Sequence, residues 1–147
     1  MTSRDKRAPV AARTLLLAAA FSLGAASQAL ARGPEGRWVT ASGNVVVAIA
    51  PCGPALCGTI DRVLANHSMA HPGQTMAALP GLGVKVLTGL AADGPGRWTG
   101  RIYNREDGKT YDCQVSLGGA DSLVVRPYVG LPVFGRTQIW RRAAQGQ

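Results

Sequence analysis

The fold is decided by residues 97–117, RWTGRIYNREDGKTYDCQVSL, which have the pattern of a β-hairpin. Two segments rich in β-branched and aromatic residues, 97–103 and 109–117, flank the turn Asn104-Arg105-Glu106-Asp107-Gly108, where glycine supplies a positive φ. Apolar and polar residues alternate along 109–117, so one face of that strand is expected to point inward. This inward face consists of Tyr111, Cys113, Val115 and Leu117.

Similar segments recur along the chain between turns that contain Gly or Pro. They predict eight short strands, at residues 37–41, 45–50, 56–64, 84–90, 97–103, 109–117, 122–129 and 134–142. Mostly tight connections indicate an up-and-down meander, and eight strands can close on themselves and so remove exposed edges. The predicted fold class is therefore all-β, an eight-stranded antiparallel up-and-down barrel. Such a barrel is filled by side chains or holds one small ligand.

Alternation in other segments indicates further core positions. The residues expected to share an inner face in the second and seventh strands are Val45, Val47, Ile49, Leu123 and Val125. In the last segment, Phe134, Arg136 and Gln138 share a face with Trp140. The pattern leaves open whether Arg136 and Gln138 face the lumen or the solvent, although a buried arginine would need a partner.

Residues 1–31 have the pattern of a secretory signal peptide: a basic start, an uncharged apolar run over 15–26, and Ala29-Leu30-Ala31 at the cleavage point. The apolar run is shorter than the roughly 20 residues that cross a bilayer. We expect cleavage after Ala31. The expected product is one periplasmic or secreted barrel domain, residues 32–147, with no transmembrane segment.

The chain is basic, with 16 Lys and Arg against 8 Asp and Glu. Residues 1–31 hold four of the basic residues and one of the acidic ones, so the predicted mature chain keeps 12 against 7 and a net charge of +5. We interpret this charge as a solvated basic surface and predict no nucleic-acid partner. Outside the cytoplasm, acidic lipids or glycans are the partners that such a surface favours.

The chain has three cysteines, all in the predicted mature domain. Cys52 and Cys57 flank the short stretch Gly53-Pro54-Ala55-Leu56, and a tight turn there would bring the two thiols close. Because the predicted compartment is oxidising, we expect these two to form a disulfide. Cys113 is expected to remain unpaired.

Five blocks of sequence carry a resemblance to a known family. They are Gly36-Arg37-Trp38, residues 51–58 (PCGPALCG), residues 103–111 (YNREDGKTY), Tyr128-Val129-Gly130 and residues 135–142 (GRTQIWRR). With these blocks, residues 33–142 resemble the bacterial family known as domain of unknown function 2147, which is similar to the calycins, the lipocalin-like superfamily of small barrels.

The resemblance implies a fold and no reaction, because the family has no assigned activity. Lipocalins also begin with a Gly-x-Trp motif on the first strand, and a late arginine packs over that tryptophan. The resemblance therefore implies that Arg141 or Arg142 packs over Trp38, with Arg141 taken as the structural partner. Residues 65–80 depart from the usual family pattern, so ligand preference is expected to differ if this segment borders a binding site.

Polar side chains near the predicted barrel mouth form a weak candidate ligand site. These residues are Tyr103, Tyr111, Arg126, Tyr128 and Gln138. An apolar ligand pocket needs a few such polar groups to orient its ligand. The alternative is that they are ordinary amphipathic barrel residues whose polar groups are satisfied locally.

Other chemistry has little support. His67 and His71 are four residues apart, but they lie in a predicted loop without a third ligand, so we predict no metal site. Cys113 has no histidine near it in sequence, and Glu106 and Asp107 are interpreted as turn residues. We therefore predict no catalytic residues, no enzymatic activity and no cofactor.

The predicted function is the binding of a small apolar or amphipathic, lipid-like ligand inside the barrel. The alternative is a non-enzymatic envelope interaction module whose barrel is filled by side chains and whose outer face docks a partner. A lumen of a few hundred Å³ favours the first function, and a packed interior favours the second. Residues 65–83 interrupt the strands for longest, and a connection this long is often functional or mobile.

Overall fold

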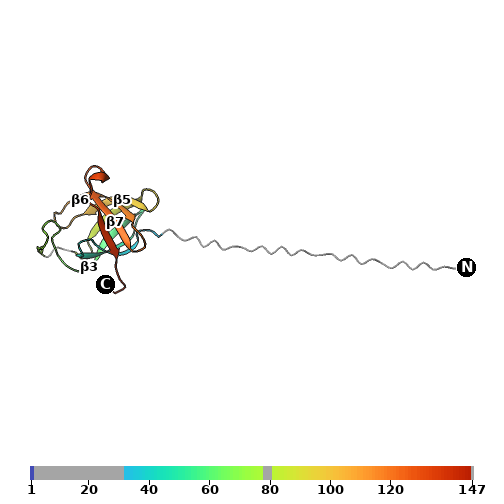
Figure 1. Cartoon of the computed structure of the whole chain (residues 1–147), viewed down its shortest axis with the longest axis horizontal. Helices are drawn as coiled ribbons and strands as arrows, with labels where there is room; N and C mark the ends of the chain where they lie inside the picture. Colours follow the sequence, from blue (N-terminus) through green and yellow to red (C-terminus); the bar gives the residue numbers. More distant parts are fainter. Residues whose placement is uncertain (2–31, 78–80, 147) are drawn as a thin grey trace.

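The computed structural model describes Met1, residues 32–77 and residues 81–146. The predicted signal peptide lies outside the described residues, apart from Met1. Eight antiparallel strands follow one another around a closed barrel in chain order, and β8 pairs with β1 to close it (Figure 1). The strands are β1 Gly36–Val39, β2 Val45–Cys52, β3 Ala55–Val63, β4 Lys85–Ala92, β5 Arg97–Tyr103, β6 Thr110–Leu117, β7 Ser122–Tyr128 and β8 Gln138–Arg142.

The antiparallel order gives the barrel two different ends. One end, here called the open end, carries the β1–β2, β3–β4, β5–β6 and β7–β8 connections. The other, the closed end, carries the β2–β3, β4–β5 and β6–β7 connections together with the start of β1 and the finish of β8. Residues at the finish of odd-numbered strands and at the start of even-numbered strands therefore lie near the open end.

A packed core fills the barrel away from the open end. The inward face predicted for β6 is confirmed, because Cys113 and Val115 are fully buried while Tyr111 and Leu117 pack against the core. The inner residues predicted for β2 and β7 are also buried. The core consists of Trp38, Val45, Val47, Ile49, Ile60, Val86, Leu87, Leu90, Ile102, Cys113, Val115, Leu123, Val125 and Trp140.

Trp38 stabilises the closed end of the barrel. Its side chain is fully buried, and its indole N–H donates a hydrogen bond of 2.8 Å to the carbonyl oxygen of Pro34. The guanidinium of Arg142 lies 4.3 Å from the centre of the indole ring. The assignment of Arg141 to this position is wrong. Alternation from the buried Trp140 places Arg142 on the inner side of β8 and turns Arg141 outward, where it is exposed.

The cysteine prediction is confirmed. Cys52 and Cys57 form a disulfide across the β2–β3 hairpin, with a Cα–Cα distance of 5.7 Å. Cys113 is a free, buried thiol, and burial raises its pKa to about 12. The thiolate needed for nucleophilic attack is therefore disfavoured at this position.

The last strand is shorter than predicted. Residues 132–134 form a 3₁₀ turn, and β8 begins only at Gln138. Pro132 has no N–H to give to a ladder, and the amide of Gly135 bonds back to the carbonyl of Pro132 at 3.0 Å. Phe134 and Arg136 consequently lie in the β7–β8 connection and not in the sheet.

We predict that Arg142→Ala lowers the free energy of unfolding by about 0.5–2 kcal/mol, because the substitution removes the cation–π contact with Trp38. The matched control is Arg141→Ala, which removes an exposed arginine from the same strand and should change stability by less than about 0.5 kcal/mol. Urea unfolding followed by tryptophan fluorescence measures both. Equal losses in the two variants would contradict the role assigned to Arg142.

Candidate functional site

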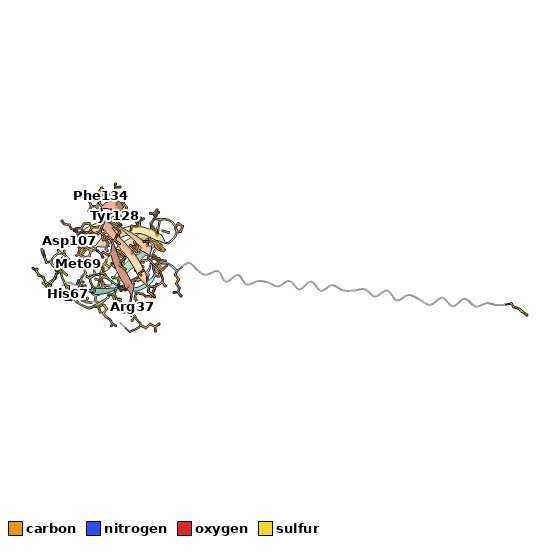
Figure 2. All side chains as sticks on the ribbon, in the orientation of Figure 1. Arg37, His67, Met69, Asp107, Tyr128 and Phe134 are labelled. Atoms are coloured by element: carbon orange, nitrogen blue, oxygen red, sulfur yellow. A yellow bond between two sulfur atoms is a disulfide. The ribbon has the colours of Figure 1, made fainter. Side chains whose placement is uncertain are left out.

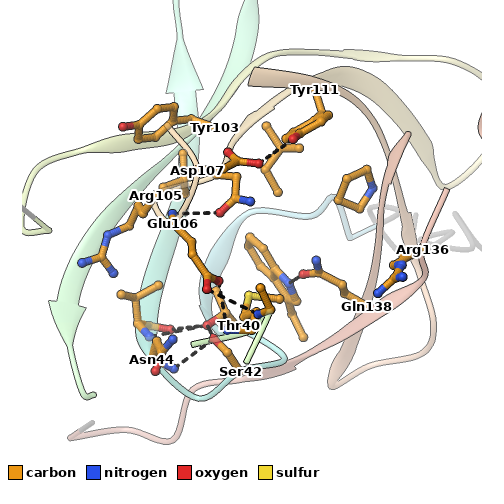
Figure 3. Close-up of a pocket in the computed structure, with 18 of the residues that line it drawn as sticks. Thr40, Ser42, Asn44, Tyr103, Arg105, Glu106, Asp107, Tyr111, Arg136 and Gln138 are labelled. Carbon is orange, nitrogen blue, oxygen red and sulfur yellow. Dashed lines mark hydrogen bonds between the residues drawn. The ribbon is translucent and has the colours of Figure 1, made fainter. Parts of the chain in front are cut away.

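A pocket of about 570 Å³ occupies the open end of the barrel (Figure 3). Its floor is apolar and belongs to the top of the core, with Val45, Val86, Ile102 and Trp140 all buried. Polar and aromatic side chains from the open-end connections, and from the strand ends next to them, surround this floor. They include Thr40, Ser42, Asn44, Tyr103, Asn104, Arg105, Glu106, Asp107, Tyr111, Tyr128, Arg136 and Gln138.

Four of the five candidate ligand residues from the sequence line this pocket: Tyr103, Tyr111, Tyr128 and Gln138. Strand ends bring them together, because each lies at or near the open-end terminus of its strand. Arg126 is not among the lining residues. Its guanidinium instead donates to the carbonyl of Pro132 at 2.6 Å and to the hydroxyl of Thr137 at 3.0 Å. Arg126 therefore braces the β7–β8 connection.

Arg136 and Gln138, whose side the sequence left open, both line the pocket. Arg136 is exposed, while Gln138 is half-buried and accepts a hydrogen bond of 3.1 Å from the indole N–H of Trp140. This bond satisfies the Trp140 indole N–H, which is the polar side-chain group of the pocket floor. The indole therefore presents an apolar ring with no free donor to whatever occupies the pocket.

One wall of the pocket comes from the β3–β4 connection, which contributes Met69, Ala70 and Met76. Asn44, 5% exposed, clamps this segment to the β1–β2 turn. The Asn44 side-chain amide donates to the carbonyl of His67 at 2.8 Å, and its oxygen accepts from the His67 amide at 2.8 Å. A short bridge between His67 and Thr75 folds the segment back on itself.

Glu106 makes the second clamp on the same segment. Its carboxylate accepts hydrogen bonds from the Ser68 hydroxyl, from the Met69 amide at 2.9 Å and from the Ala70 amide at 3.4 Å. The bond from Ser68 lowers the pKa of Glu106 most; partial desolvation opposes it, and the two amides lower the pKa further. Glu106 is thus more than a turn residue, because its side chain ties the β5–β6 connection to the pocket wall (Figure 3).

Asp107 does keep the turn role predicted for it. One carboxylate oxygen accepts from the Lys109 amide at 2.8 Å, and the other accepts from the Tyr111 hydroxyl at 2.5 Å (Figure 3). Burial alone would raise the pKa of Asp107, but the bonds from Tyr111 and Lys109 lower it. The same Asp107–Tyr111 bond raises the pKa of Tyr111. At the pocket rim this gives a fixed carboxylate and a neutral phenol.

His67 and His71 are exposed on the β3–β4 connection, where Figure 2 labels His67 at the edge of the molecule. Within residues 32–77 and 81–146, no group of three or more His, Cys, Asp or Glu side chains is placed to hold a metal ion. No helix in that same part of the chain is long and apolar enough to span a membrane.

Residues 36–142 match the family described as an uncharacterised protein conserved in bacteria, DUF2147. The chain belongs to the DUF2147 family. The resemblance stated from the sequence blocks is therefore confirmed over nearly the whole barrel. No curated protein matches the sequence closely enough to be a relative.

Among solved structures, this DUF2147 barrel is similar to the protein HP1028 from the human pathogen Helicobacter pylori, which is described as belonging to the lipocalin family. The TM-score is 0.55 at 20% sequence identity, and the match covers 75% of this chain and 82% of that one. At this level of identity the comparison supports the lipocalin-like fold alone, and the pocket must be interpreted from its own residues.

We predict that Glu106→Gln loosens the pocket wall without unfolding the barrel, because a neutral amide accepts weaker hydrogen bonds than a carboxylate. Amide hydrogen exchange at Met69 and Ala70 should accelerate about tenfold, while exchange in the core strands stays unchanged. Asp93→Asn, which neutralises an exposed carboxylate in the closed-end β4–β5 connection, is the control. Unchanged exchange at Met69 in Glu106→Gln would show that the clamp does not hold the wall.

The same clamp should depend on pH. Because the pKa of Glu106 is lowered in the folded protein from an ordinary value of 4.5, its stabilising effect is complete above pH 4.5 and is lost as the pH falls through the lower folded pKa. The NMR shifts of the Met69 and Ala70 amides should therefore titrate with a midpoint below 4.5. This titration should disappear in Glu106→Gln. A midpoint at or above 4.5 would contradict the charge-assisted clamp.

Proposed function

We propose that this protein binds a small amphipathic molecule in the open-end pocket, outside the cytoplasm and without transforming it chemically. The observation that carries the proposal is the contrast between the two halves of the barrel. The closed half is packed around Trp38, whereas the open half keeps about 570 Å³ above an apolar floor. Ligand pockets commonly measure about 300–1,000 Å³ and combine apolar walls with a few polar groups.

The lining indicates how such a ligand would lie. Its apolar part would contact Trp140, Val86 and Ile102 at the floor, where the only side-chain polar atom of these three, the Trp140 indole N–H, is bonded to Gln138. Its polar part would stay near the rim, where Tyr103 and Arg136 offer a hydroxyl and a guanidinium. The lining therefore suits a molecule with one apolar end and one polar end.

Two observations support a location outside the cytoplasm. Residues 1–31 have the composition of a cleavable secretory leader. The Cys52–Cys57 disulfide belongs to the kind of bond that persists in oxidising compartments and is rare in the cytosol. The alternative function, an interaction module, assumed a barrel filled by side chains, and the open-end pocket favours ligand binding over it.

We predict that Ile102→Trp weakens binding of the apolar fluorescent probe N-phenyl-1-naphthylamine at least about tenfold, because the larger side chain occupies the pocket floor. Ile139→Trp is the matched control. Ile139 is an exposed residue of β8 outside the pocket, so the same substitution there should leave probe affinity unchanged. Fluorescence titration measures both variants, and circular dichroism checks that each remains folded.

Native mass spectrometry of the purified protein is the complementary test. A bound small molecule that is present in the parent protein and in Ile139→Trp but absent from Ile102→Trp would support the proposal. Equal probe affinity in all three proteins, or no probe binding and no bound mass in the parent protein, would refute it.

A further inference from the structure

The β7–β8 connection holds four large apolar side chains in solvent. Val129 is 72% exposed, Leu131 59%, Val133 70% and Phe134 75%. These four residues are here called the apolar tip. Four apolar side chains are thus exposed within six residues of sequence, and clusters of exposed apolar side chains mark sites that contact a membrane, another protein or a ligand. Figure 1 shows this connection projecting beyond the barrel, and Figure 2 labels Phe134 at its outer edge.

The connection is braced in this outward position. The Phe134 amide bonds to the carbonyl of Leu131 at 3.0 Å, and Arg126 holds the carbonyl of Pro132 from below at 2.6 Å. Gly135 lies so close to β7 that a Cβ atom there would meet the carbonyl oxygen of Pro127 at 2.5 Å. The loop therefore has little freedom to fold the apolar tip inward, and the tip does not need to be ordered when it binds.

The surroundings of the apolar tip are positively charged. Residues 122–137, which lead into and out of the tip, contain two arginines and no Asp or Glu. Arg126 and Arg136 flank the tip, and none of the salt bridges within the described parts of the chain uses either of them. The guanidinium of Arg126 donates to neutral oxygens of Pro132 and Thr137. The mouth carboxylates Glu106 and Asp107 belong to the β5–β6 connection and already accept hydrogen bonds there.

We propose that the apolar tip inserts into the interface of an anionic phospholipid membrane, so that the open end of the barrel faces the bilayer. Apolar side chains beside cationic ones are the combination that binds such interfaces, through apolar burial and attraction to acidic headgroups. A second copy of the chain fits less well, because two like-charged tips repel and four side chains are few against the about 800 Å² per partner of a standard interface.

Membrane docking would place the pocket next to a lipid phase. Val129 and Phe134 line the pocket as well as belonging to the tip, so the bound surface and the pocket mouth are continuous. Leu131 and Val133 lie in the tip without lining the pocket. This division lets docking be tested separately from the proposed ligand function, on which the inference does not depend.

The test is sedimentation of the purified full chain with vesicles of phosphatidylglycerol and phosphatidylethanolamine, compared with vesicles of phosphatidylcholine. Every variant carries the same residues 1–31, so these residues do not account for a difference in binding between variants. Leu131→Ser/Val133→Ser should weaken binding to the anionic vesicles at least about tenfold, because each side chain loses its apolar burial. The control Ile139→Ser should bind like the parent protein, because Ile139 is exposed on β8 away from the tip.

Arg136→Gln should weaken binding to the anionic vesicles more than to the neutral ones, and added salt should have the same effect on the parent protein. Unchanged probe binding in Leu131→Ser/Val133→Ser would show that the barrel is intact and the pocket unaffected. Ile102→Trp should retain vesicle binding, which separates a failure of docking from a failure of ligand binding. Equal vesicle binding by the tip variant and the parent protein would overturn the inference. A dimer that the tip variant abolishes, without any vesicle binding, would also overturn it.

Discussion

The structure depends on closing a sheet across a very short seam. β1 and β8 are paired through only two residue positions, Trp38 with Arg142 and Val39 with Arg141. Trp38 reinforces this seam from inside, since its ring is buried against the core, its N–H is held by Pro34 and its face is covered by Arg142. Because a closed barrel has no free edge, pairing β1 with β8 keeps these two strands from presenting unpaired edges.

Fastening one end has a direct consequence for the other. The largest buried side chains, including Trp38, Leu90 and Leu123, fill the barrel from the closed end up to the level of Trp140. Beyond that level the strands end in longer connections, whose side chains line the pocket. The pocket therefore results from where the packing stops, and Trp140 serves at once as the top of the core and the base of the pocket.

Most of the fold could be predicted from local patterns in the sequence. Alternation in 109–117 identified the inner face of β6, and the spacing of Cys52 and Cys57 identified the disulfide. Contacts between segments that lie far apart in the chain could not be predicted from the sequence. Asn44 and His67 are 23 positions apart, and Ser68 and Glu106 are 38, so no local pattern in a single sequence pairs them. The incorrect assignment of Arg141 in place of Arg142 was avoidable from the sequence. Residues two apart on a strand share a face, and Arg142 lies two residues after the buried Trp140.

The pocket wall differs in kind from the rest of the barrel. The β3–β4 connection contributes Met69 and Met76 to the lining, yet it is attached through a few hydrogen bonds to Asn44 and Glu106 and not through the strand ladder. Loops attached in this way tolerate insertion and substitution better than strands. Substitutions in this connection can therefore reshape the pocket wall while the strands beneath it stay unchanged.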